Sequence, residues 1–160
     1  YVKKSLNGEK YKEFLENNII DLKFEVQEVN HINILYSSFS CHNDVVPSID
    51  YDSYIKRIMK HSRFSIYILI LSMLYIRYIL YNFPNFTITP SNRYRLMACS
   101  MFVAYIHLED DYLTYGEYSR VIGIQKNELV ELVRKFLILI DFKVMSFDKL
   151  VDKYRDDFKV

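Results

Sequence analysis

The stretch from Phe64 to Tyr81 constrains the fold of this chain more than any other. A helix over these residues is apolar on nearly every side, through Ile66, Ile68, Leu69, Ile70, Leu71, Met73, Leu74 and Ile76. Such a helix is either buried in a protein or embedded in a membrane. The uninterrupted run is too short to cross a bilayer, and Arg77 lies near its end. We therefore expect a buried central helix over 63–81, capped by Ser62.

Composition indicates one all-α domain with a core of its own. Of the 160 residues, 51% are hydrophobic and 26% are charged, which is an ordinary globular balance. Three glycines and three prolines are too few for an all-β or loop-rich fold. The net charge of +1 implies no broad electrostatic field toward nucleic acid or an anionic membrane. The abundance of Ile, Tyr, Phe, Lys and Asn, which have AT-rich codons, indicates an AT-rich genome.

Two further helices flank the central one. Asp50 is a candidate cap for a helix over 50–61 that carries Tyr54, Ile55 and Ile58 on one face. Thr89 as cap and Pro90 in the first turn predict another helix over 90–107. The only alanines of the chain, Ala98 and Ala104, fall in that helix. Because small residues let neighbouring helices approach closely, we expect it at the centre of the bundle.

Two more helices follow an acidic turn at Asp110-Asp111. Thr114 and Glu117 have the spacing of a capping box, and Gly123 is placed to end a short helix over 115–121. The fifth helix is expected over 125–140. Its apolar positions at helical spacing are Leu129, Leu132, Val133, Phe136 and Ile140.

The ends of the chain are less regular. Residues 1–47 are expected to form a partly helical N-terminal extension that ends in a loop, with Tyr11, Phe14 and Leu15 on one face of a short helix. The helical domain is expected over 48–145. Residues 146–160 form a polar C-terminal segment for which a helix is one interpretation. The first residue is Tyr1, not Met, so we expect a fragment of a longer protein.

The region from Ser48 to Val144 resembles a single cyclin box of the phosphate-regulon (P-type) cyclins. The resemblance rests on short matches in a shared order: Tyr54 and Arg57 in SIDYDSYIKRI, YIR at 75–77, PNFTI at 84–88, Tyr94-Arg95, Asp110-Asp111, YSRVIG at 118–123, and Phe136-Leu137 to Phe142. No single match is specific, but their order and spacing are. The resemblance implies a five-helix cyclin fold with an N-terminal extension.

Three positions depart from the family pattern. Typical cyclins hold their kinase with a Lys at the end of helix three and a Glu in helix five, and this chain has Ile106 and Val133 there. An Asp that normally pairs with the helix-one Arg and the helix-three Lys is Arg77. Arg57 and Arg77 cannot share a buried cluster unless a carboxylate comes from Asp110 or the N-terminal extension. A simpler interpretation places Arg77 in solvent.

The resemblance also implies a partner-binding face and a structural set. The face would comprise the end of helix three, helix five and the turn after it, through Ile106, His107, Glu109, Val133, Leu137, Phe142 and Val144. The structural set is Arg57, Arg77, Tyr94, Arg95 and Ala104. Ile106 and Val133 are either exposed apolar residues of this face or core residues.

No residue pattern supports chemistry. His31, His42, His61 and His107 could ligate a metal with Cys41 and Cys99, but no CxxC or HxxxH spacing joins them, so no metal or cofactor is expected. Glu109 to Asp111 form a solvated acidic turn without a partner base or nucleophile. There is no glycine-rich phosphate loop. We therefore expect a non-enzyme with reduced thiols, in the nucleus or the cytoplasm.

Taken with the resemblance, these features predict a regulatory subunit that binds a cyclin-dependent-like protein kinase. The altered positions favour a divergent kinase, or a partner aided by a third subunit. The alternative is a cyclin-fold scaffold that has lost kinase activation and assembles other partners. A nucleic-acid partner is disfavoured by the neutral charge, and a membrane partner by the short apolar run.

Overall fold

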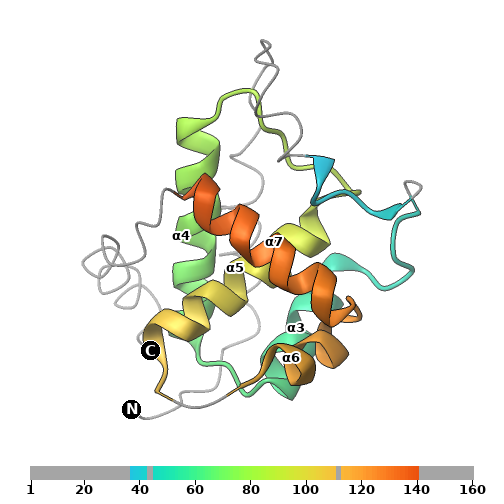
Figure 1. Cartoon of the computed structure of the whole chain (residues 1–160), viewed down its shortest axis with the longest axis vertical. Coiled ribbons are helices and arrows are strands. Elements are labelled where there is room, and N and C mark those ends of the chain that lie inside the picture. The colour runs from blue at the N-terminus through green and yellow to red at the C-terminus, as the bar shows by residue number, and fades with distance from the viewer. Residues whose placement is uncertain (1–36, 43–44, 111–112, 141–160) are drawn as a thin grey trace.

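The computed structural model describes residues 37–42, 45–110 and 113–140. Figure 1 shows their five helices in chain order: α3 (Tyr51–His61), α4 (Ile66–Asn82), α5 (Arg93–Leu108), α6 (Tyr115–Ile122) and α7 (Lys126–Leu139). These residues contain no strand, so the all-α expectation is confirmed. None of the described helices is both long enough and apolar enough to cross a bilayer.

Helix α5 is the centre of the bundle. It packs against α4, α7 and α3, and every residue from Leu96 to Tyr105 is buried. Eleven of its 16 residues are buried, compared with 11 of the 17 in α4, so the expectation that this helix is the most buried is confirmed within the described chain. Ala98 and Ala104 are fully buried.

Small residues meet where α4 crosses α5. The Ser100 hydroxyl donates to the backbone carbonyl of Ser72 at 2.6 Å, and the Ser72 hydroxyl donates to the carbonyl of Leu69 at 2.7 Å. Both serines are fully buried, so these bonds avoid the cost of leaving a hydroxyl without a partner. The serines therefore allow a close crossing without unsatisfied polar atoms.

Three of the expected helix caps are present. Asp50 accepts a hydrogen bond from the backbone N–H of Ser53 at 3.2 Å. Thr114 and Glu117 form the complete capping box of α6. Gly123 ends α6 with φ of 72°, in the left-handed region, and its N–H donates to Ser119 O at 3.0 Å.

Two helices start later than the sequence predicts. Ser62 closes α3, and Ser65 precedes α4, because Arg63 has a φ of 54° and interrupts the helical path. Helix α5 begins at Arg93 and not at Pro90, because Asn92 shapes a turn before it. The Asn92 side chain accepts from the N–H of Thr89 at 2.9 Å and donates to the carbonyl of Thr87 at 2.9 Å.

The segment 37–42, expected as part of a polar loop, contributes to the core. Phe39 is fully buried, with its ring 6.5 Å from that of Phe136 on α7 in an edge-to-face arrangement. The N–H of Cys41 donates to the carbonyl of Ser91 at 3.0 Å, and Lys135 Nζ donates to Ser38 Oγ at 2.9 Å. The segment is therefore fixed to both α7 and the turn before α5.

Candidate partner-binding surface

The C-terminal end of α5 leaves the core after Tyr105. Ile106 is 54% exposed, whereas His107 and Glu109 are half-buried. Glu109 ends the helix, and its carboxylate accepts a hydrogen bond from the Ser65 hydroxyl at 3.4 Å. This end of α5 therefore has one exposed isoleucine, and the nearby Glu109 carboxylate is hydrogen-bonded to the residue that precedes α4.

The position of Val133 corrects one expectation. Val133 is only 2% exposed, on the face of α7 that also buries Leu129, Leu132, Phe136 and Leu139. These positions recur at helical spacing and point into the bundle, so Val133 is a core residue, which was the alternative interpretation. The expectation that Val133 is exposed on the binding face is wrong.

The exposed apolar residue of α7 is Ile138, which the sequence analysis did not single out. It is 47% exposed, and the neighbouring Leu137 is half-buried. The sequence could have indicated the exposure of Ile138, because this position lies off the helical face that carries the core positions Phe136 and Leu139. Phe142 and Val144 lie outside the described residues.

The exposed apolar side chains thus lie near the C-terminal ends of two packed helices. Helices α5 and α7 pack together and cross, so in Figure 1 their C-terminal ends diverge, that of α7 toward the upper left and that of α5 toward the lower left. We call the described residues at these two separate helix ends, Ile106, His107, Glu109, Leu137 and Ile138, together the α5–α7 surface. Exposed apolar side chains of this kind suit a protein partner, because covering them removes apolar area from water.

The two arginines of the altered cluster have different surroundings. Arg57 is exposed on α3, and its Nε donates to the carbonyl of Val121 in the last turn of α6 at 3.1 Å. A positive charge at a helix C-terminus is favourable. Arg77 is exposed on α4. Arg57 therefore links α3 to α6 through a carbonyl.

Tyr94 and Arg95 have structural partners at the start of α5. The Tyr94 hydroxyl donates to the carbonyl of Ile49 at 2.7 Å, and its ring packs edge-to-face against Tyr51 and Tyr54. Arg95 Nε donates to Glu128 Oε1 at 2.8 Å, between side chains that are 13% and 24% exposed. Both residues join neighbouring elements to α5.

Glu128 is a residue that the sequence analysis missed. Its Oε1 also lies 3.3 Å from Nε2 of His42, so one carboxylate joins α7, α5 and the segment before α3. Partial burial acts to raise the pKa of Glu128, but the hydrogen bond and charge of Arg95, with His42, hold it below 4.5. The spacing of 33 residues between Arg95 and Glu128 gave no local signal.

The buried ionisable groups of the core have structural partners. The Tyr118 hydroxyl donates to the carbonyl of Ala98 at 2.7 Å, and the Tyr54 hydroxyl donates to the carbonyl of Ile122 at 2.8 Å. Burial raises the pKa values of Tyr54, Tyr118 and Cys99, so all three stay protonated at neutral pH. Within the described ranges, no three His, Cys, Asp or Glu side chains gather as metal ligands would.

Comparison with known proteins identifies the family. The profile described as Cyclin matches residues 10–144, which is most of the chain. The chain belongs to the cyclin family. The match includes all five described helices and extends into the N-terminal region.

Individual cyclins are similar to this one at low identity. The Nuc-1 negative regulatory protein preg of Neurospora crassa is 32% identical over 104 residues, which are 65% of this chain and 22% of that protein. PHO85 cyclin PHO80 of Saccharomyces cerevisiae is 27% identical over 107 residues, 67% of this chain and 36% of that protein. Cyclin-U1-1 of Arabidopsis thaliana is 26% identical over 113 residues, 71% of this chain and 54% of that protein.

These relatives confirm the expected resemblance to P-type cyclins. The region matched in this chain spans only 22% to 54% of the length of these relatives.

Proposed function

We propose that this cyclin is a regulatory subunit that binds a cyclin-dependent-like protein kinase through the α5–α7 surface. The observation that carries the proposal is the pair of exposed isoleucines, Ile106 and Ile138, near the C-terminal ends of two central cyclin-fold helices. Such a subunit performs no chemistry of its own. It stabilises the kinase conformation in which the regulatory helix is docked and the ATP-binding Lys–Glu pair is formed.

The affinity would come mainly from apolar burial. The resemblance assigns a Lys and a Glu to the positions of Ile106 and Val133, and Val133 is enclosed in the core. Ile106 and Ile138 would each contribute about 1.5–3 kcal/mol if fully covered. An apolar contact tolerates partners that a charged grip would reject. We therefore expect a divergent kinase, or a kinase complex completed by a third subunit.

Phe142 and Val144 would extend the surface beyond the described residues, and His107 and Glu109 would form its polar edge. A polar edge around an apolar centre is the usual anatomy of a protein interface. The net charge of +1 gives no reason to expect nucleic acid as a partner. Nuclear or cytoplasmic localisation is part of this proposal, since protein kinases of this class are found there.

Co-purification tests the proposal. The tagged chain is isolated from cells under mild conditions, and the proteins that stay bound are identified by mass spectrometry. The same isolation with Ile106→Asp and Ile138→Asp is the comparison, and Val45→Asp, which changes a 70% exposed valine, is the control. We expect a protein kinase that is present with the wild-type chain and the control and is lost with the double variant.

A scaffold without kinase activation is the second candidate. It is favoured by the loss of the family's acidic and basic residues at Arg77, Ile106 and Val133 together. Adding the purified chain to its kinase and measuring phosphoryl transfer separates the two functions. A rise in activity supports the regulatory subunit, and binding without a rise supports the scaffold. The chain alone should give only background in the same assay.

A further inference from the structure

Helix α4 is buried on every side over its middle. Each of the nine residues from Ile68 to Ile76 is at most 6% exposed. Successive residues of a helix are about 100° apart, so nine residues go round it more than twice. The middle of α4 is therefore covered on the side away from α5 as well as on the side facing it.

The contact between Ser72 and Ser100 fixes which side of α4 faces α5. Residues two positions before and after Ser72 lie about 200° round the helix, on the opposite side. They are Ile70, which is fully buried, and Leu74, which is 6% exposed. We call this side the outer face of α4, and it comprises Tyr67, Ile70, Leu74, Arg77, Tyr78 and Tyr81.

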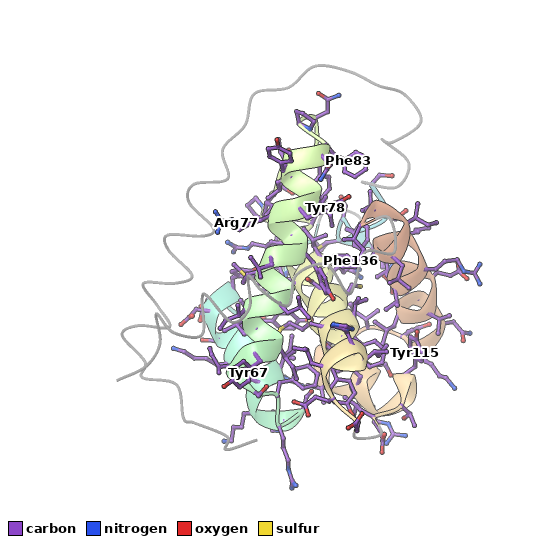
Figure 2. All side chains as sticks on the ribbon, turned by 90° about the vertical axis from the view of Figure 1, so that its left-hand side faces the viewer. Tyr67, Arg77, Tyr78, Phe83, Tyr115 and Phe136 are labelled. Carbon is purple, nitrogen blue, oxygen red and sulfur yellow. The ribbon has the colours of Figure 1, made fainter. Side chains whose placement is uncertain are left out.

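The described helices do not account for this burial. Helix α5 packs along α4, and Tyr75 reaches α7 through a ring contact with Phe136 at 6.3 Å. In Figure 2, which labels Tyr67, Arg77 and Tyr78 along α4, no other described helix lies in front of it. We propose that the outer face of α4 is the docking site for this chain's own N-terminal segment, residues 10–35.

The path of the chain supports this occupant. Ser38 and Phe39 are fixed on α7 beside Lys135 and Phe136, and Phe136 in turn contacts Tyr75 of α4. The first described residues of the chain therefore lie beside α7, where Phe136 contacts α4. Helix α4 is roughly 25 Å long at about 1.5 Å per residue, a span that 26 residues cover in helical or extended form. Tethering also makes the association intramolecular, which raises the effective concentration.

The extent of the family match supports the same segment. The cyclin profile matches from residue 10 to residue 144, so residues 10–35 fall within the matched region, whereas residues 145–160 fall outside it. The sequence between 10 and 35 also supplies apolar side chains for an apolar face: Tyr11, Phe14, Leu15, Ile19, Ile20, Leu22, Phe24, Val26, Val29, Ile32, Ile34 and Leu35.

Charge distinguishes this segment from the C-terminal one. Residues 10–35 contain five acidic residues, Glu13, Glu16, Asp21, Glu25 and Glu28, and three basic residues, Lys10, Lys12 and Lys23. Arg77, on the outer face, is the only charged residue of α4. Residues 141–160 contain five acidic and five basic residues and offer no such complementarity. An acidic segment is therefore the better partner for a face that carries a single cation.

Photo-crosslinking of the full chain tests the proposal without destabilising it. The photoreactive residue p-benzoylphenylalanine replaces Tyr67 on the outer face, or Tyr115 on α6 as a control that faces elsewhere (Figure 2). After irradiation the crosslinked peptides are identified by mass spectrometry. We expect intramolecular products from position 67 that contain residues 10–35, and none of these from position 115. Products that join position 67 to residues 141–160, or to a second copy of the chain, would overturn the proposal.

A matched pair of variants gives a second measurement. In a helical segment Leu15 and Asn17 lie about 200° apart, so Leu15→Asp and Asn17→Asp add the same charge on opposite sides. The chain has no tryptophan, so Tyr67→Trp introduces a single fluorescent reporter on the outer face. We expect Leu15→Asp to move its emission to longer wavelength and to increase its quenching by acrylamide, with no change from Asn17→Asp. An unchanged emission in Leu15→Asp, with a shift caused by Leu150→Asp instead, would assign the face to the C-terminal segment.

Discussion

At the scale of single residues, tyrosine hydroxyls join the helices that frame the core. Tyr54, Tyr94 and Tyr118 each donate to a backbone carbonyl of another element, at 2.7 to 2.8 Å. The three bonds connect α3 to α6, α5 to the turn before α3, and α6 to α5. Because these tyrosines are buried, their hydroxyls would otherwise lose hydrogen bonds to water on folding. The result is a closed set of polar links around an apolar centre.

Removing one of these hydroxyls should lower stability measurably. We expect Tyr118→Phe to reduce the free energy of unfolding by about 1 kcal/mol, because one buried hydrogen bond is lost while the ring stays in place. Urea denaturation measures the change. Tyr115→Phe is the control, since the Tyr115 ring packs on Phe102 but its hydroxyl makes no hydrogen bond to a described residue. A Tyr118→Phe protein as stable as the wild type would show that the bond to Ala98 contributes nothing.

Glu128 predicts a dependence of stability on pH. Its folded-state pKa is lowered below 4.5, so the folded state favours the ionised carboxylate. The stabilisation is therefore complete above the unfolded-state pKa and is lost as pH falls through the folded-state pKa. Glu128→Gln should be less stable than the wild type at pH 7, and the difference should shrink below about pH 4.5.

The measurement is urea denaturation of both proteins between pH 3 and pH 7. Glu131→Gln, which changes an exposed carboxylate of the same helix, serves as the control and should show a smaller effect. A difference between wild type and Glu128→Gln that stays constant across this range would contradict the assigned cause.

At the scale of helices, two glycines of α6 differ in the backbone conformation that they adopt. One lies within the helix and the other ends it. Gly123 has a φ of 72°, which L-residues with a side chain rarely adopt, whereas Gly116 lies inside the helix. A Cβ at Gly116 would meet Thr114 Oγ1 at 3.8 Å, an ordinary contact. We expect Gly123→Ala to destabilise the protein by about 1 kcal/mol and Gly116→Ala to stabilise it by about 0.5–1 kcal/mol.

Thermal unfolding of the two alanine variants tests these expectations. The two variants are a matched pair, because each adds one methyl group and the positions lie within eight residues of one another. Opposite shifts of the melting temperature are expected. Destabilisation by Gly116→Ala, or none by Gly123→Ala, would show that backbone conformation does not decide the outcome here.

Helix positions were predictable where the sequence repeats a local signal. The apolar runs of α4 and α5, the Asp50 cap, the Thr114–Glu117 box and Gly123 all act within a few residues, and each is where the sequence places it. The starts of α4 and α5 were misplaced by three residues each, because Arg63 and Asn92 shape turns that no helix signal describes.

The candidate site was less predictable, because exposure depends on contacts between distant elements. Val133 and Ile138 are both β-branched residues of one helix; helical spacing places Val133 with Phe136 and Ile138 off that face, and the packing of α7 on α5 buries the first. The Arg95–Glu128 ion pair and the burial of Phe39 against Phe136 also join residues far apart in the sequence. The resemblance to cyclins predicted which two helices form the surface, but it did not predict which of their side chains are exposed.

At the scale of the whole molecule, the packed core is distinct from the exposed residues proposed to bind a partner. The core is built around α5, and the exposed isoleucines lie where α5 and α7 emerge from it. Substitutions at Ile106 and Ile138 should therefore change binding with little effect on stability, since an exposed side chain contributes little to folding. Binding and stability can thus be measured on the same variants.

We propose that exposed apolar residues of α5 and α7 hold a protein kinase. Titration calorimetry of the co-purified kinase measures its dissociation constant for the wild type, the Ile106→Asp and Ile138→Asp double variant, and the Val45→Asp control. We expect the double variant to bind at least about tenfold more weakly, because covering each isoleucine is worth about 1.5–3 kcal/mol and 1.4 kcal/mol is tenfold. The control should bind as the wild type does. A folded double variant that binds the kinase with wild-type affinity would show that these isoleucines do not contact it.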